Sequence, residues 1–289
     1  MTGVIRIGIS GWNYPPWRGV FYPKTLRRKD ELGYAAARFN TIEINGTFYA
    51  TQRPQSFLNW FEAAPDDFVF AVKAPRYITH LLRLRNVETP LANFLASGVL
   101  RLGRKLGPVL WQLPPNMTFD EGRLAAFFSL LPHDGKAAMA CARRHDGRLK
   151  GEPWLEIEPG LRLRHAVEIR HESFRDERFV ALLRRYDVAL VCADSVAWPR
   201  LMDVTSDFIY CRLHGAKALY ASGYDENALS QWARWTRRWA AGGEPRDTER
   251  IDGKASVRQA GCDVFLYFDN DAKVKAPENA LALARLVAA

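Results

Sequence analysis

The stretch GPVLWQLPPNMTFDEGRLAAFFSLL, Gly107–Leu131, contains one complete strand–loop–helix unit. Its first part, Gly107–Leu113, is apolar on nearly consecutive positions, as expected for a parallel strand that is covered on both faces. Asp120 then precedes the amphipathic segment RLAAFFSLL, and an aspartate in that place commonly caps a helix. The unit therefore predicts a buried strand followed by a helix that packs on it.

Strand-like runs recur about eight times along the chain, and a helical pattern follows each one. This alternation predicts an α/β fold, and eight repeats predict a TIM-type (β/α)8 barrel that forms a single domain over residues 1–289. A doubly wound sheet is the main rival, but the sequence has no GxGxxG motif after its first strand. The predicted strands are Val4–Ile9, Thr41–Phe48, Phe68–Ala74, Gly107–Leu113, His165–Arg170, Val188–Ala193, Phe208–Leu213 and Asp263–Phe268.

Helix starts and two insertions can also be located. Pro54 and Pro277 suit first helical positions, and Thr89 before Pro90 is an expected N-cap. Two segments look like insertions into the barrel: Asp134–Leu163 after the fourth strand and Ala241–Gly261 before the eighth.

The composition limits the class of protein. No secretory signal opens the chain and no apolar run approaches the roughly 18 residues of a membrane span, so we expect a soluble protein with no membrane contact. The four cysteines form no CxxC pair, which favours buried thiols in a reducing cytoplasm. The net charge of +9 is compatible with nucleic acid or a small anion as partner. Because the basic residues are scattered, nucleic acid is the less favoured of the two.

Polar and apolar residues alternate within several predicted strands. In TIEINGTFY, Thr41–Tyr49, the two isoleucines share one face, and Glu43 and Asn45 share the other. If the apolar face packs on the outer helices, the polar face points into the barrel, near the C-terminal strand ends where barrel enzymes carry their active sites. The polar residues expected there are Glu43, Lys73, Gln112, Glu168, Arg170, Asp194, Arg212, His214, Asp269, Asn270 and Asp271.

Charged side chains inside a barrel must pair, bind a metal or line a solvated pocket, because an isolated buried charge costs several kcal/mol. A structural ion-pair network is one explanation, and a ligand site is the one we favour. Three acids roughly balance three cations: Glu43, Glu168 and Asp194 against Lys73, Arg170 and Arg212.

An aromatic loop, GISGWNYPPWRGVFYP, covers Gly8–Pro23 and follows the first strand. It would lie at the same mouth of the barrel, where Trp12, Tyr14, Trp17, Phe21 and Tyr22 can wall or roof a pocket. The alternative is an aromatic plug over the barrel core. Flat rings above polar groups suit a sugar or a nucleobase.

These motifs together resemble the domain-of-unknown-function 72 family, also called YecE-like. The matching stretches are IGISGWNYPPWRGVFYP, YAAARFNTIEINGTFYA, FVFAVKAPRYITH, GPVLWQLPP, AVEIRHESF, YCRLHG, YFDND and APENA. The resemblance implies a TIM barrel and no particular activity. Gly46 stands where the family more often has serine, and Asp269 where it often has asparagine, so the second difference adds an acid to the mouth. The motif positions that carry over, without roles, are Ser10, Gly11, Trp12, Tyr14, Trp17, Glu43, Asn45, Phe48, Tyr49, Lys73, Thr79, His80, Gln112, Glu168, Arg170, His171, Asp194, Arg212, His214, Gly215 and Asn270.

Three functions compete, and we expect an enzyme rather than a binding protein. The first is a hydrolase or isomerase that uses a divalent metal, such as Mg, Mn or Zn, on a sugar-like or phosphorylated substrate. The second is metal-free acid/base chemistry on a sugar or phosphate ester. The third is a non-catalytic protein that binds nucleic acid or another anion.

The candidate residues follow from these alternatives. Glu43, Glu168, Asp194 and His214 are the catalytic candidates and also the candidate metal ligands. For His80 and His171, a loop or capping hydrogen bond explains the residue as well as chemistry does. The candidates for ligand binding are Ser10, Trp12, Tyr14, Trp17, Asn45, Tyr49, Lys73, His80, Gln112, Arg170, His171, Arg212 and Asn270.

Overall fold

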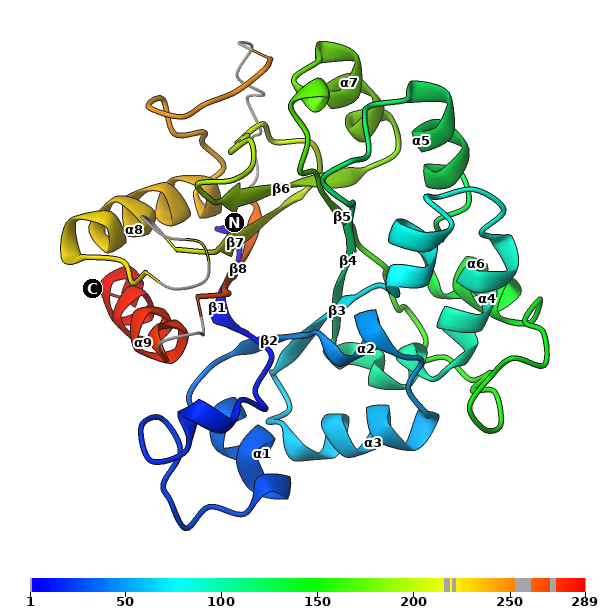
Figure 1. Ribbon diagram of the computed structural model, residues 1–289, viewed down its shortest axis with the longest axis horizontal. Helices are drawn as coiled ribbons and strands as arrows, with labels where there is room; N and C mark the ends of the chain where they lie inside the picture. Colours follow the sequence, from blue (N-terminus) through cyan, green and yellow to red (C-terminus); the bar gives the residue numbers. More distant parts are fainter. Residues whose placement is uncertain (1, 216–218, 220–221, 253–260, 271–273, 289) are drawn as a thin grey trace.

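Eight parallel strands pair in sequence order, and the last pairs with the first to close a barrel (Figure 1). The computed structural model describes residues 2–215, 219, 222–252, 261–270 and 274–288. The closed barrel confirms the predicted TIM-type architecture. Its strands are β1 Ile5–Ser10, β2 Thr41–Ile44, β3 Val69–Lys73, β4 Leu106–Gln112, β5 His165–Glu168, β6 Val188–Asp194, β7 Phe208–Leu213 and β8 Asp263–Phe268.

Helices surround the barrel, as Figure 1 shows. The α-helices are α1 Glu31–Ala36, α2 Gly46–Tyr49, α3 Pro54–Ala63, α4 Glu88–Ala96, α5 Glu121–Phe128, α6 Gly135–Ala142, α7 Glu177–Arg185, α8 Glu226–Ala240 and α9 Lys275–Ala288. The 3₁₀- and π-helical segments are η1 Pro15–Trp17, η2 Arg28–Asp30, η3 Tyr77–Leu81, η4 Val99–Lys105 and η5 Glu172–Phe174. The predicted cap of α5 is confirmed, because the Asp120 carboxylate accepts a hydrogen bond from the backbone N–H of Arg123.

Several boundaries differ from the predictions. The strand expected over Thr41–Phe48 ends at Ile44, and α2 occupies its second half. Helix α4 begins at Glu88, so Thr89 lies within its first turn and the prediction of an N-cap there was wrong. Helix α9 begins two residues before Pro277, at Lys275.

The barrel interior is divided between an apolar layer and a polar layer. Its buried apolar cluster consists of Ala71, Leu110, Ala166, Ala189, Val191, Phe208, Tyr210, Phe265 and Tyr267. Strands β1 and β2 approach each other so closely at Gly8 that a Cβ atom there would lie 1.9 Å from the carbonyl oxygen of Thr41. The inward positions one step nearer the C-terminal strand ends carry polar side chains. The apolar layer is therefore packed, and the charged side chains lie on its side nearer the C-terminal strand ends.

The two expected insertions pack differently. In Asp134–Leu163, α6 contacts α4, and the backbone N–H of Trp154 donates to the carbonyl of Ala96. Ala241–Gly261 is described at 241–252 and 261, and residues 253–260 lie outside the described part. The backbone N–H groups of Ile251 and Asp252 donate to the Asp203 carboxylate.

The cysteines agree with the expectation drawn from the composition. All four cysteines are free and buried, as predicted. Among the helices that the structure describes, none is both long enough and apolar enough to cross a membrane.

Candidate functional site

Arg212 lies at the centre of the polar layer and contacts three carboxylates. It is 1% exposed on β7, and its Nε and Nη2 atoms donate to Glu43 at 3.0 and 2.9 Å. Its Nη1 donates to Glu168 at 2.8 Å, and Nη2 also reaches Asp269 at 2.9 Å. A guanidinium has five N–H donors in a fixed plane, so one arginine can hold carboxylates that come from different strands.

Glu43 is enclosed by further donors. The Tyr210 hydroxyl donates to it at 2.6 Å, and the Ser10 hydroxyl donates to its other oxygen. Ser10 in turn accepts a hydrogen bond from Asn45 Nδ2 at 3.1 Å. Burial and the neighbouring Glu43 carboxylate raise the pKa of Tyr210 well above its ordinary value, so this phenol stays a donor. Both oxygens of the Glu43 carboxylate therefore accept hydrogen bonds from within the protein, including those from Arg212.

Glu168 has a more varied set of partners. Gln112 Nε2 lies 3.1 Å from both of its oxygens, and Arg170 Nε donates to it at 2.9 Å. Burial alone would raise the pKa of Glu168, but the cations of Arg212 and Arg170 lower it well below the ordinary value. Glu168 is thus held as a carboxylate and is suited to accept a proton or a hydrogen bond, not to act as an acid.

Asp269 completes the group and links it to His214. Its carboxylate lies 3.0 Å from His214 Nδ1, and His214 Nε2 lies 3.9 Å from Glu168. Burial opposes the charge on Asp269, but Arg212 and His214 lower the pKa of this carboxyl to about 2. The ring of Trp198 meets His214 edge-on, and the Arg170 guanidinium lies 3.8 Å over the same tryptophan.

Several predicted residues lie apart from this cluster. Asp194 pairs with Arg200 at 3.0 Å and accepts a hydrogen bond from the Tyr224 hydroxyl at 2.9 Å. Asn270 donates to the carbonyl of Ser222 and to Asn279, which ties β8 to α9. His171 accepts a hydrogen bond from Ser173 N and caps η5, which agrees with the alternative of a capping hydrogen bond. Asp271 lies outside the described residues.

The four candidate metal ligands are therefore not gathered in one place. Asp194 lies with its own partners, and the Arg212 guanidinium occupies the space between Glu43 and Glu168. Across the part of the chain that the structure describes, no group of three or more His, Cys, Asp or Glu side chains has the arrangement to hold a metal ion. Because the Arg212 guanidinium is already hydrogen-bonded to Glu43, Glu168 and Asp269, these carboxylates do not fit a divalent ion.

Lys73 and His80 lie close to the same cluster. Lys73, at the end of β3, is 7% exposed, and its Nζ lies 4.2 Å from the centre of the Phe48 ring. Burial and the nearby Arg212 lower the pKa of Lys73 to about 8. Burial and the charges of Arg170 and Lys73 lower the pKa of His80 to about 4. Arg170 and Lys73 thus both disfavour the charged form of His80, and its imidazole is neutral near pH 7.

An aromatic cavity of about 320 Å³ opens beside the charged cluster, and four predicted ligand residues line it. The rings of Trp12 and Trp60 meet edge-on at 5.7 Å, and the Tyr14 hydroxyl donates to the carbonyl of Ser10. Gly11 has a φ of +82°, a conformation that glycine adopts easily. The lining residues are Gly11, Trp12, Asn13, Tyr14, Ile44, Asn45, Gly46, Tyr49, Gln52 and Trp60.

Trp17 does not belong to this cavity. It is fully buried and packs against Tyr14, Phe21 and Tyr22. The prediction that it walls a pocket was wrong, because η1 turns the ring into the core. Within the loop Gly8–Pro23, Trp12 therefore lines the aromatic cavity, whereas Trp17 is packed in the core.

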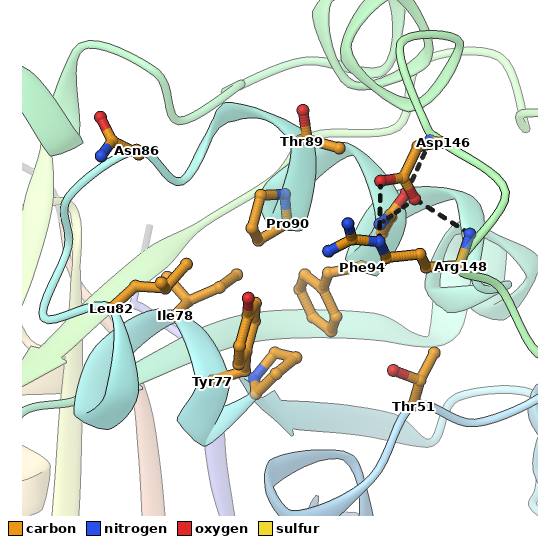
Figure 2. Close-up of a pocket in the computed structure, with 12 residues that line it drawn as sticks. Thr51, Tyr77, Ile78, Leu82, Asn86, Thr89, Pro90, Phe94, Asp146 and Arg148 are labelled. Atoms are coloured by element: carbon orange, nitrogen blue, oxygen red, sulfur yellow. Dashed lines mark hydrogen bonds and ion pairs between the residues drawn. The ribbon is translucent and has the colours of Figure 1, made fainter.

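A second cavity, of about 420 Å³, lies beyond η3 (Figure 2). Its lining comes from three distant segments, around Thr51, along Tyr77–Phe94, and at Asp146 and Arg148. Asp146 accepts hydrogen bonds from Asn93 and from the backbone N–H of Arg148. No predicted site residue lines it, and no local sequence signal joins segments so far apart.

Comparison with known proteins gives the family but no activity. The family model for "Protein of unknown function DUF72" matches residues 6–289. The UPF0759 protein YecE of Escherichia coli is 29% identical over 187 residues, which cover 60% of this chain and 65% of that protein. The UPF0759 protein YunF of Bacillus subtilis is 31% identical over 117 residues, 39% of this chain and 40% of that protein. The matched segments thus span less than two thirds of these relatives.

Solved structures agree in fold. A DUF72 family protein from Thermotoga maritima superposes with a TM-score of 0.71 at 22% identity, covering 99% of this chain and all of that one. One from Enterococcus faecalis gives a TM-score of 0.69 at 16% identity, covering 99% of this chain and 96% of the other. With the family model extending over nearly all of its length, this chain belongs to the DUF72 family.

Proposed function

We propose that this protein is an enzyme that acts, without a metal ion in the carboxylate cluster, on a small anionic, sugar-like molecule at the C-terminal mouth. The observation that carries the proposal is the position of Arg212, which bridges Glu43, Glu168 and Asp269 and occupies the space between these acids that a metal ion would need. Arg170, which pairs with Glu168, and the buried Lys73 lie at the same cluster and would attract an anionic group of the substrate. This favours the metal-free alternative over the metal-dependent one.

The aromatic cavity and the charged cluster would bind different parts of the substrate. The aromatic cavity offers the rings of Trp12 and Tyr49 with the amide groups of Asn45 and Gln52, a combination that suits a polar ring. Asn45 also donates to Ser10, so it joins the cavity to the charged cluster. Glu168, held ionised by its neighbours, is the best placed of the carboxylates to accept a proton.

Binding measurements test this proposal. Isothermal titration calorimetry with sugar phosphates and their unphosphorylated parents, in the presence of EDTA, should show preference for the phosphorylated forms. Arg170→Gln should weaken the binding of the phosphorylated form by roughly tenfold or more, because it removes a charge-assisted contact. Trp12→Ala should weaken both forms alike, since it removes a wall and no charge.

The control variant is Arg104→Gln, because Arg104 pairs with Asp66 before β4, at the opposite end of the barrel. It should leave both affinities unchanged. The proposal fails if the Arg170 and Arg104 variants bind the sugar phosphates equally well, or if no compound of the panel binds the wild-type protein.

A further inference from the structure

Two lysines are buried among the described residues, and their amines have opposite surroundings. Lys105 is 2% exposed, and its Nζ donates to the carbonyl oxygens of Phe61 and Ala64, both at 2.7 Å. Lys73 is 7% exposed, and within the described chain its Nζ makes no hydrogen bond and no ion pair. Its observed contact is the face of Phe48, with 4.2 Å between Nζ and the ring centre. Lys105 has a structural explanation, and Lys73 lacks one.

The acids near Lys73 do not neutralise it by pairing. Glu43, Glu168 and Asp269 all act on it through their charge, but each carboxylate is bonded to Arg212 instead. Arg212 itself repels the ammonium. A lysine that is desolvated and lies near a second cation loses its proton easily, and this is how enzymes prepare an amine nucleophile.

The backbone holds Lys73 at the mouth. It is the last residue of β3, and its carbonyl accepts a hydrogen bond from the Thr47 hydroxyl at 2.7 Å. That bond also fixes α2, which carries Phe48 onto Lys73 and Tyr49 into the aromatic cavity. The amine and the proposed ring-binding cavity are therefore attached to the same short helix.

We propose that Lys73 forms an imine with the carbonyl carbon of an aldehyde or ketone substrate. The inference deepens the proposed function and rests on it for the anionic, sugar-like character of that substrate. The Nζ lone pair attacks the carbonyl carbon and a C–N bond forms. The carbonyl oxygen then leaves as water together with the two amine hydrogens, and a C=N bond remains. The ionised Glu168 is available to accept a proton from the carbon next to that bond.

Reductive trapping on the whole 289-residue chain tests the proposal. The protein is incubated near pH 8 with neutral glycolaldehyde or anionic glyoxylate, reduced with cyanoborohydride, digested and analysed by mass spectrometry. On the order of a hundredfold more Lys73 than ordinary lysine is unprotonated at that pH, since its pKa is about 8. We expect Lys73 to be labelled roughly tenfold or more above the exposed Lys24 and Lys29, since unprotonated amine is the reacting form. The buried Lys105 should stay unlabelled.

The variants Lys73→Arg and Lys73→Met should lose this label and keep the background on other lysines. If either variant fails to fold, the ratio of labels in the wild-type protein still decides. Labelling of Lys73 at or below the level of Lys24 with both probes would overturn the imine. If sugar phosphates still bound through Arg170 in that case, the proposed function would survive. Strong labelling of Lys73 by glycolaldehyde without any binding of sugar phosphates would support the imine and overturn the anionic substrate.

Discussion

At the scale of single residues, Arg212 decides whether the barrel interior is stable. It makes hydrogen bonds to Glu43, Glu168 and Asp269, and the two glutamates are fully buried. Arg212→Met leaves these carboxylates without their shared cation, which should lower the free energy of unfolding by about 3–5 kcal/mol. Urea denaturation measures the loss.

Arg200→Gln is the matched comparison. Arg200 pairs with the single acid Asp194 and its side chain is 39% exposed, so the cost should stay below about 1 kcal/mol. Equal losses in the two variants would show that the Arg212 cluster has no special role in stability.

Asp269 gives the cluster a measurable acid dependence. Its pKa lies at about 2 in the folded protein against an ordinary 3.8, so folding favours the ionised form. Such a group stabilises the fold above about pH 4, and the contribution is lost as the pH falls from 4 towards 2. The shift corresponds to roughly 2 kcal/mol, from about 1.4 kcal/mol per pKa unit.

Asp269→Asn should therefore flatten the decline in unfolding free energy between pH 4 and pH 2. Glu168, whose pKa is also lowered, contributes to the slope that remains. Asp66→Asn is the control, since the side chain of Asp66 is 89% exposed and it should leave the curve unchanged. An identical acid dependence in wild type and Asp269→Asn would refute the assignment.

At the scale of secondary-structure elements, the alternation rule predicted most of the polar layer. Counting every second residue places Glu43, Lys73, Gln112, Glu168 and Arg212 inside the barrel, as the structure has them. The same alternation, combined with the register between β6 and β7, corrects the predicted position of Asp194. Ala193 pairs with Arg212 and Asp194 with Leu213, so Asp194 lies on the outward face.

The turn from β2 into α2 could not be predicted in this way. The alternating pattern of TIEINGTFY continues beyond the strand, but Asn45 adopts helical angles, with φ −93° and ψ −20°. The cause is tertiary, because the Thr47 hydroxyl donates to the carbonyls of Ile44 and of Lys73 on the next strand. A contact between strands leaves no local signal, yet it sets the position of Phe48 over Lys73.

At the scale of the whole molecule, the repeated strand–helix pattern predicts the barrel, but it does not predict the cavities. Eight strand–helix units determine closure, since each unit buries its apolar faces against the next. The cavity of Figure 2 instead depends on how the insertion Asp134–Leu163 packs against α4, which also contacts η3. Such packing joins residues that are far apart in sequence, and composition carries no information about it.

The surface charge leads to the last prediction, which concerns nucleic acid. Many exposed arginines have an acidic partner on the surface, for example Arg104 with Asp66, Arg162 with Asp207 and Arg178 with Asp176. Paired charges produce a weaker field than a basic stripe, so the net charge of +9 should support only non-specific attraction. Fluorescence anisotropy with single-stranded RNA and duplex DNA should give dissociation constants no tighter than about 1 μM at physiological salt, weakening steeply as salt rises. Tight binding that resists salt would instead favour base contacts, and would make the aromatic cavity of Trp12 and Tyr49 a stacking site for nucleobases.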